Sequence, residues 1–342
     1  MRRLTVIVLL AAAFAIATVG VVFVRDLVAD PPSASCQAPP TAFGPSISVA
    51  GHHQIAIDYV CAGASQSGTL YLSAGPGPYP VAVWVHGAGP ATSLSFGGVI
   101  APLVDSGVAV FSYDKRGVGE SQGACCPGDN GHFNLLTADV VGAIAALASR
   151  SDVRRDEIGL IGASQAGWIA PKATVDSGKV AFIALASATP VSERLTNTYE
   201  RLARGDEGRL AKDEISRRLA TAGASGFDPL PFLQQMTVPS LWMFGTEDDR
   251  VPVTESIALL DQLKSRGKDI TIVTFPGAGH GLLDTPPSAP NAPPTLVDWI
   301  LKHVHPASRY AYVPLLECRV TSHAPAAMRS ALETSARSSD SA

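Results

Sequence analysis

Ser164 lies in the segment 162–167, GASQAG, directly after the apolar run 158–161. A serine on a tight turn between a strand and a helix projects its hydroxyl at the edge of a sheet, and small neighbours allow such a turn without collision. The helix that follows points its first amide N–H groups toward the serine. Ala166 stands where the second glycine of Gly-x-Ser-x-Gly is usual, and Gly167 follows it. The segment predicts a nucleophilic serine.

A glycine-rich turn, 86–90 (HGAGP), follows a second apolar run at 81–85. Acyl transfer needs backbone N–H donors aimed at the oxygen that becomes negatively charged in the transition state. A turn rich in glycine lets two amides face one point. We therefore expect the Ala88 N–H as the first donor of an oxyanion hole and the Gln165 N–H as the second. His86 is interpreted as a structural residue.

A third turn, 245–252 (GTEDDRVP), follows the apolar run 238–244. A carboxylate in this position can orient a histidine and stabilise its charged form. The turn contains three acidic residues: Glu247, Asp248 and Asp249. The turn alone does not distinguish among them.

The segment 277–281, GAGHG, follows the last apolar run, 270–275, and contains His280. The chain has eight histidines, and His280 alone follows a late apolar run in a glycine-rich turn. The order serine, acid, histidine along the chain is the order expected when a catalytic triad is built on a mostly parallel sheet. His280 is therefore the predicted base for Ser164.

These turns come after short β-branched runs that alternate with helical patterns. Strands are predicted at 54–60, 68–73, 81–86, 108–113, 158–162, 180–185, 238–244 and 270–275, and helices at 134–149, 257–263 and 295–303. Such alternation indicates an α/β fold with a mostly parallel sheet flanked by helices. Ligands bind beyond the carboxyl ends of the strands in these sheets, and the candidate residues are predicted to lie there.

From about residue 66 to 305 the chain resembles α/β-hydrolases, particularly the dienelactone-hydrolase and prolyl-oligopeptidase-like branch of esterases and peptidases. The matching segments are 86–90, 113–121 (YDKRGVGES), 162–167, 245–252 and 279–281. The resemblance implies that the acid stands three residues after Gly245 and four before Pro252, which places it on Asp248 with Asp249 in reserve. It also implies that 113–121 is a structural loop near the site.

The predicted activity is cleavage of a carboxylic ester, or a related acyl bond of a small molecule, through an acyl-enzyme on Ser164. One fold hosts esterases, peptidases and acyltransferases, so a cell-surface acyltransferase and an aminopeptidase-like peptidase remain alternatives. A third hypothesis is a non-catalytic binding protein with the same fold. The complete set of serine, acid and histidine argues against it, because a binding protein would have no need to keep all three. No cofactor or metal is expected, because His303 and His305 alone are too small a ligand set.

The segment 190–232 is densely charged and lies between two predicted strands. It predicts two amphipathic helices and no strand. Its position favours a cap over an active site, and an ordinary solvated helical excursion is the alternative. The hydrolase domain is expected at 46–306. The tail, 307–342, is rich in alanine and serine and is expected to be largely disordered.

The N-terminus carries Arg2 and Arg3, followed by Leu4 to Val24 without a charge. The run is long enough to cross a hydrocarbon core of ~30 Å and longer than the ~7–15 residues usual in a signal peptide. We expect 1–29 to be a transmembrane anchor, with a cleaved signal as the alternative, and 30–45 to be a linker. Arginines before the run predict that the rest of the chain lies outside the cytoplasm.

Composition excludes some functions. The chain has 342 residues, 46% hydrophobic and 16% charged, with a formal net charge of −4. There is ample material for a core and no basic stripe that would indicate nucleic-acid binding.

Five cysteines leave at least one unpaired within the chain. Export permits disulfides. Cys36 and Cys61 flank the first predicted strand and could be bridged, whereas the pairing of Cys125, Cys126 and Cys318 stays open.

Overall fold

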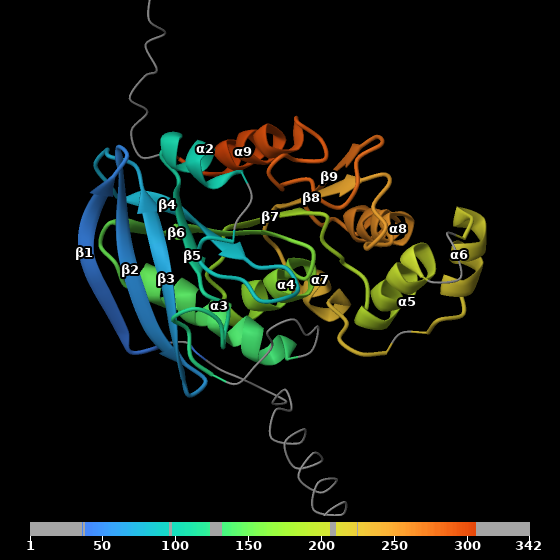
Figure 1. Ribbon diagram of the computed structural model, residues 1–342, viewed down its shortest axis with the longest axis horizontal. Coiled ribbons are helices and arrows are strands. Elements are labelled where there is room, and N and C mark those ends of the chain that lie inside the picture. The colour runs from blue at the N-terminus through green and yellow to red at the C-terminus, as the bar shows by residue number, and fades with distance from the viewer. Residues whose placement is uncertain are drawn as a thin grey trace, which may run out of the picture. The chain divides into compact units, whose positions relative to one another are not determined.

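Nine strands form one mixed sheet in the part of the chain that the computed structural model describes (Figure 1). That part comprises residues 36, 38–95, 98–123, 132–205, 210–223 and 225–305. The strand order is β1-β2-β3-β5-β4-β6-β7-β8-β9. The strands from β5 to β9 in this order are parallel, and β1, β2 and β3 continue the sheet in antiparallel pairs. The predicted α/β fold with a mostly parallel sheet is confirmed.

The strands are β1 (Thr41–Val49), β2 (His52–Cys61), β3 (Ala64–Leu72), β4 (Tyr79–Val85), β5 (Ala109–Tyr113), β6 (Val153–Ala163), β7 (Phe182–Ala186), β8 (Ser240–Gly245) and β9 (Ile270–Phe275). The helices are α2 (Ile100–Asp105), α3 (Phe133–Ala148), α4 (Ala166–Ser177), α5 (Glu193–Arg204), α6 (Lys212–Leu219), α7 (Leu230–Gln235), α8 (Val253–Ser265) and α9 (Ala292–His303).

The central strand β4 shows why the parallel strands are continuous apolar runs in the sequence. All of its residues are buried. Val81, Val83 and Val85 pack into the apolar cluster that includes α3, α4 and α8, whereas Ala82 and Trp84 pack into the cluster that includes α2 and α9. Successive side chains of a strand point to opposite faces, so a strand covered by helices on both faces needs apolar residues throughout. Figure 1 shows α2 and α9 across the sheet from α3 and α4.

The edge strand β1 corrects the sequence interpretation of residues 30–45 as a linker. β1 begins at Thr41, so the folded domain starts before residue 46. Most of its residues are exposed, and they therefore lack the alternation of apolar and polar residues that marks a half-buried strand. Its register shifts between Phe43 and Ser46, and a proline such as Pro45 is tolerated at a bulge of an edge strand.

The segment between β7 and β8 forms α5, α6 and α7, and its described residues contain no strand. Leu202 and Ala203 of α5 pack against Ile215 and Leu219 of α6. This apolar cluster is separate from the two that flank the sheet. Helices α5 and α6, which form this cluster, are called the cap below.

A disulfide joins Cys36 to Cys61, at the end of β2, with a Cα–Cα distance of 5.4 Å. Both cysteines are buried. The bridge fixes the chain just before β1 to the sheet. Cys125, Cys126 and Cys318 lie outside the described residues.

The segments 1–29 and 307–342 also lie outside the described residues, so the expected anchor or signal and the expected disordered tail are not described by the structure. Within the described ranges, none of the helices has the length and apolar character needed to cross a membrane.

Loss of the disulfide should destabilise the domain. Its two cysteines are 25 residues apart in the sequence, and closing a loop of that length in the unfolded chain stabilises the folded state by about 3.5 kcal/mol. The free energy of unfolding of the Cys36→Ser, Cys61→Ser double variant, measured in urea, should be lower than that of the wild type by about this amount. Dithiothreitol should lower the stability of the wild type and leave the double variant unchanged. Equal sensitivity of both proteins to the reductant would contradict the assignment.

Candidate active site

The four turns singled out in the sequence meet at one edge of the sheet. They follow β4, β6, β8 and β9, which are parallel to one another. The carboxyl ends of parallel strands lie at the same edge, where α/β folds bind ligands. The topology therefore brings together segments that are up to about 190 residues apart in the chain.

Ser164 occupies the turn between β6 and α4, and its φ angle is +57°. A residue with a side chain is strained in this left-handed conformation, and strain of this kind is typical of functional sites. The turn is held by hydrogen bonds from the Ser164 N–H to the carbonyl of Ser187 (3.1 Å) and from the Gly167 N–H to the carbonyl of Ser164 (3.0 Å). The backbone thus fixes the direction of the serine side chain.

Two glycines explain the unusual spacing around Ser164. A Cβ on Gly162 would lie 2.3 Å from the carbonyl oxygen of Val85 and 2.8 Å from the Cβ of Ala166. Ala166 therefore fits because Gly162 leaves room for it. A Cβ on Gly167 would lie 2.3 Å from the carbonyl oxygen of Thr189, so the glycine is needed one residue later than in the usual motif.

His280 and Asp248 form a hydrogen-bonded pair. The Nδ1 atom of His280 lies 2.9 Å from Oδ2 and 3.0 Å from Oδ1 of Asp248. The Asp248 side chain has no exposed surface, and its Oδ1 accepts the backbone N–H groups of Arg250 (2.8 Å) and Val251 (3.0 Å). The backbone therefore holds the carboxylate in place, and the carboxylate orients the imidazole.

The geometry separates the three acids that the sequence left as competitors. Asp249 is partly exposed and lies 3.8 Å from the Arg204 guanidinium of α5. Glu247 is exposed and pairs with the Lys212 ammonium of α6 at 3.0 Å. Only Asp248 of the three contacts His280 among the described hydrogen bonds.

A pocket of about 90 Å³ contains Ser164. Its lining consists of Ala88, Ser164, Gln165, Trp168, Thr189, Thr196, Asn197, Glu200, Arg250 and Val251. Ser164 thus shares a pocket with both residues predicted to supply oxyanion donors. Arg250 and Val251 also donate to Asp248, so one wall of the pocket is the turn that carries the acid.

Helix α5 forms one wall of this pocket. Thr196, Asn197 and Glu200 line it from α5. The Tyr199 hydroxyl, on the same helix, donates to the backbone carbonyl of Asp248 at 2.7 Å. Helix α5 therefore contacts both the pocket of Ser164 and the turn that carries Asp248.

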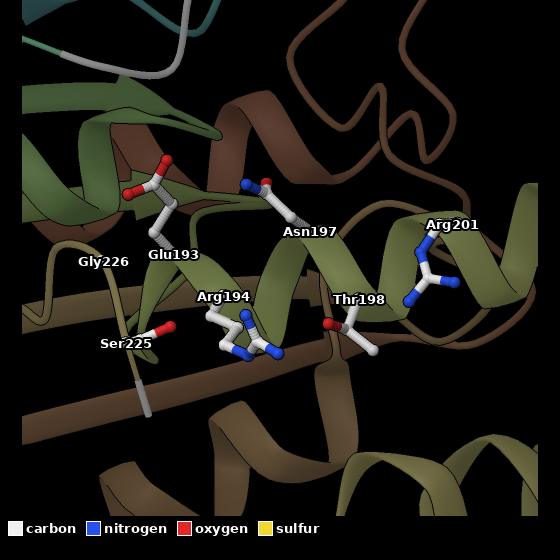
Figure 2. Close-up of a pocket in the computed structure, with 7 residues that line it drawn as sticks. All are labelled: Glu193, Arg194, Asn197, Thr198, Arg201, Ser225 and Gly226. Atoms are coloured by element: carbon white, nitrogen blue, oxygen red, sulfur yellow. The ribbon is translucent and has the colours of Figure 1, made fainter. Parts of the chain in front are cut away.

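A larger pocket, of about 410 Å³, lies along α5. Figure 2 shows that five of its residues come from this helix and two from the segment beside it: Glu193, Arg194, Asn197, Thr198 and Arg201, then Ser225 and Gly226. Gly226 has no side chain, and the other six residues all have polar side chains. Asn197 lines both pockets, so the two lie on adjoining faces of one helix.

His86 is a buried structural residue, as the sequence predicted. Its Nε2 atom is hydrogen-bonded to the backbone carbonyl of Tyr113, and its ring packs edge-on against the Tyr113 ring. Burial lowers the pKa of His86 to about 4. The imidazole is therefore neutral at neutral pH, and it fixes β4 to β5 at the start of the 86–90 turn.

The loop after β5 contains two buried cations whose roles the sequence did not reveal. Lys115 extends toward the 86–90 turn, and its Nζ lies 2.9 Å from the carbonyl oxygen of Gly87. Arg116 binds Asp139 of α3 through Nε at 3.0 Å. Burial raises the pKa of Asp139 to about 7 although Arg116 opposes that shift. The sequence signal that could have indicated these buried cations is the pair of adjacent basic residues two positions after the end of the buried strand β5.

His303 and His305 do not converge on a common point. The Nδ1 of His303 is hydrogen-bonded to the carbonyl of Trp299, and the Nδ1 of His305 lies 2.7 Å from Glu157. In the described ranges, no group of three metal-binding side chains is present.

Comparison with known proteins assigns this chain to a family. The sequence profile of the prolyl oligopeptidase family matches residues 94–306. Acylamino-acid-releasing enzyme 1 of Oryza sativa subsp. japonica is 25% identical over 238 residues, which are 66% of this chain and 30% of that enzyme. The chain thus spans under a third of the length of this curated relative.

Solved structures share the fold at low sequence identity. Acetyl xylan esterase from Paenibacillus sp. R4 is 17% identical, with a TM-score of 0.58 over 78% of this chain and 89% of that chain. The acylaminoacyl peptidase of Pyrococcus horikoshii is 17% identical, with a TM-score of 0.53 over 79% of this chain and 42% of that chain.

Replacing His86 by glutamine should reduce the loss of stability on acidification. The pKa of about 4 in the folded protein is below the ordinary value of about 6.5, so the unfolded chain binds a proton between these pH values that the folded protein does not. The stability from neutral His86 is complete above about pH 6.5 and is lost as the pH falls toward 4.

Between pH 7 and pH 5, the free energy of unfolding of the wild type should fall by about 2 kcal/mol more than that of His86→Gln. Urea denaturation at both pH values measures this difference. Asp139 is present in both proteins, so its titration cancels in the comparison. If the free energy of unfolding decreased equally in the two proteins between pH 7 and pH 5, the burial of a neutral His86 would be contradicted.

Proposed function

The chain belongs to the prolyl oligopeptidase family and is a hydrolase of the esterase and peptidase type, and we propose that it cleaves carboxylic esters through Ser164. The observation that carries this proposal is the pocket of Ser164. Ala88 and Gln165 line that pocket with the serine, and its wall holds the carboxylate that orients His280.

In the proposed mechanism, His280 takes the proton of the Ser164 hydroxyl, and the serine oxygen attacks the ester carbonyl carbon. With Nδ1 protonated, His280 donates to Asp248, which leaves Nε2 free to act as the base. The backbone N–H groups of Ala88 and Gln165 stabilise the oxyanion of the tetrahedral intermediate. The alcohol leaves with the proton from His280, and water then releases the acid from the acyl-enzyme.

The size of the pocket supports a short acyl group. Its volume of about 90 Å³ accommodates a few carbon atoms, and α5 forms one of its walls. The larger pocket beside it is lined by polar side chains, which supports a hydrophilic alcohol rather than a lipid. The substrate class that we propose is therefore a short-chain ester of a polar alcohol.

Cleavage of an N-acylated peptide is the second candidate, because the similar curated protein is an acylamino-acid-releasing enzyme. The p-nitrophenyl ester and the p-nitroanilide of N-acetylalanine differ only in the bond to be cleaved. We expect turnover of the ester and none of the anilide above the Ser164→Ala background. Anilide turnover above that background would assign peptidase activity. Transfer to an added alcohol, detected by product analysis, would assign acyl transfer.

We also propose that the protein acts outside the cytoplasm. The two N-terminal arginines before a long apolar run support export. The buried Cys36–Cys61 disulfide supports it independently, since such bonds persist in oxidising compartments. Protease digestion of intact cells should degrade the protein, and complete protection until lysis would contradict an external location.

Ser164→Ala should abolish ester hydrolysis. With p-nitrophenyl esters from acetate to decanoate, we expect the wild-type kcat/KM to be highest for the shortest acyl groups. The variant should lose at least about 10⁴-fold in kcat, because the nucleophile is missing. Ser177→Ala, at the end of the helix that follows Ser164, is the matched control and should retain wild-type rates. Equal hydrolysis by the wild type and Ser164→Ala would refute the proposal.

Neighbouring carboxylates provide a matched test of the acid. Asp248→Asn should lower kcat by about 10⁴-fold, because an amide no longer stabilises the charged imidazole or the productive tautomer. Asp249→Asn should change kcat by less than about threefold, since exposed ion pairs contribute little. Both variants should keep the circular dichroism spectrum of the wild type. A larger loss in Asp249→Asn would reverse the assignment.

A further inference from the structure

Lys115 is a buried cation that is bound to the 86–90 turn and to the turn that contains Ser164. Its side chain is almost without exposed surface. Its Nζ atom lies 2.9 Å from the carbonyl oxygen of Gly87, 3.2 Å from that of Gly89 and 2.9 Å from the side-chain Oε1 of Gln165. An ammonium group has three N–H donors, so it can donate to all three of these acceptors.

The strand order explains how one side chain reaches both turns. β4 lies between β5 and β6 and is parallel to each. Lys115 follows the end of β5, Gly87 follows the end of β4, and Gln165 follows the end of β6. The lysine side chain therefore crosses the end of β4 and connects three consecutive strand ends.

Peptide geometry gives the contact with Gly87 a specific consequence. The carbonyl of Gly87 and the N–H of Ala88 belong to the same peptide group, which is planar, so in the trans form they point in opposite directions. A carbonyl held by Lys115 therefore turns the Ala88 N–H away from the lysine. Ala88 lines the pocket of Ser164, where this N–H is the proposed oxyanion donor.

The charge of the lysine adds to this effect. A hydrogen bond from an ionised donor is about twice as strong as a neutral one. In a buried site, it also polarises the peptide whose carbonyl accepts it, which strengthens the N–H at the other end of that peptide. The third contact holds the side chain of Gln165, which is buried and whose backbone N–H is the second proposed donor.

We propose that Lys115 is the positioning residue of the oxyanion hole. It does not contact the substrate. It fixes the orientation of the Ala88 peptide and the place of Gln165, so that both amides already face the position of the oxyanion before the ester binds. This role rests on the proposed function of Ser164, because it has a catalytic effect only if an oxyanion forms there.

Lys115→Met tests the role, since methionine fills a similar volume without a charge or a donor. Rates with p-nitrophenyl acetate are divided by the concentration of active serine from burst titration, so that misfolded molecules do not count. We expect kcat to fall by about 10- to 100-fold, which is less than the roughly 10²- to 10³-fold loss found when an oxyanion donor is removed outright. KM should change by less than about threefold, because the ground-state carbonyl depends little on this site.

A methyl trifluoromethyl ketone provides the readout that a purely structural role would not move. Its adduct with Ser164 carries an oxyanion, so its inhibition constant should rise by about the same factor as kcat falls. Lys115→Gln keeps an N–H donor and should recover part of both quantities. It also carries the comparison if Lys115→Met does not fold. Lys172→Met, on the outer part of α4 and paired with Asp176, is the matched control and should match the wild type.

Two outcomes separate this role from the proposed function. A wild type that neither hydrolyses the ester nor reacts with the ketone would overturn both. If the wild type is active, and kcat and the inhibition constant of Lys115→Met both stay within twofold of the wild-type values, only the role of Lys115 is overturned. The same conclusion follows if kcat falls while the inhibition constant is unchanged.

Discussion

The pairing of β4 with β5 on one side and β6 on the other is the constraint on which the site depends. It sets the end of β4 next to the end of β6, with Val85 opposite Gly162. A side chain on Gly162 would collide with the Val85 carbonyl, so the same residue permits both the strand pairing and the turn of Ser164. The remaining parts of the site are attached to this frame: Lys115 crosses it, and the turn of Asp248 forms one wall beside it.

The sequence predicted the central elements well because the local signal and the tertiary environment agree there. The strand at 270–275 has its predicted bounds, and the predicted helix 134–149 is displaced by one residue. β1 was missed because an exposed edge strand has no apolar alternation. Asp248 and Asp249 are chemically alike, and only the folded turn buries the first and leaves the second partly exposed.

Lys115 and Arg116 illustrate what local sequence patterns cannot show. Lysine and arginine are rarely buried unless they are paired, so their type predicts exposure. The partners of these two residues are distant in the chain and cannot be read from the local sequence. Lys115 binds the turns at the catalytic edge, whereas Arg116 binds Asp139 of α3 and the carbonyl of Cys61. One short loop thus connects the catalytic edge to the helix beneath the sheet and to the disulfide-bonded strand β2. Such a connection exists only after the strands have paired.

The cap has its own apolar cluster, and this separation has an evolutionary consequence. Because Leu202 and Ile215 pack within the cap, mutations there can accumulate without disturbing the clusters that hold the sheet. Substitutions in this cluster should therefore leave the catalytic frame intact. The face of α5 toward the site is more constrained, because Thr196, Asn197 and Glu200 line the pocket of Ser164 and the Tyr199 hydroxyl contacts the Asp248 turn.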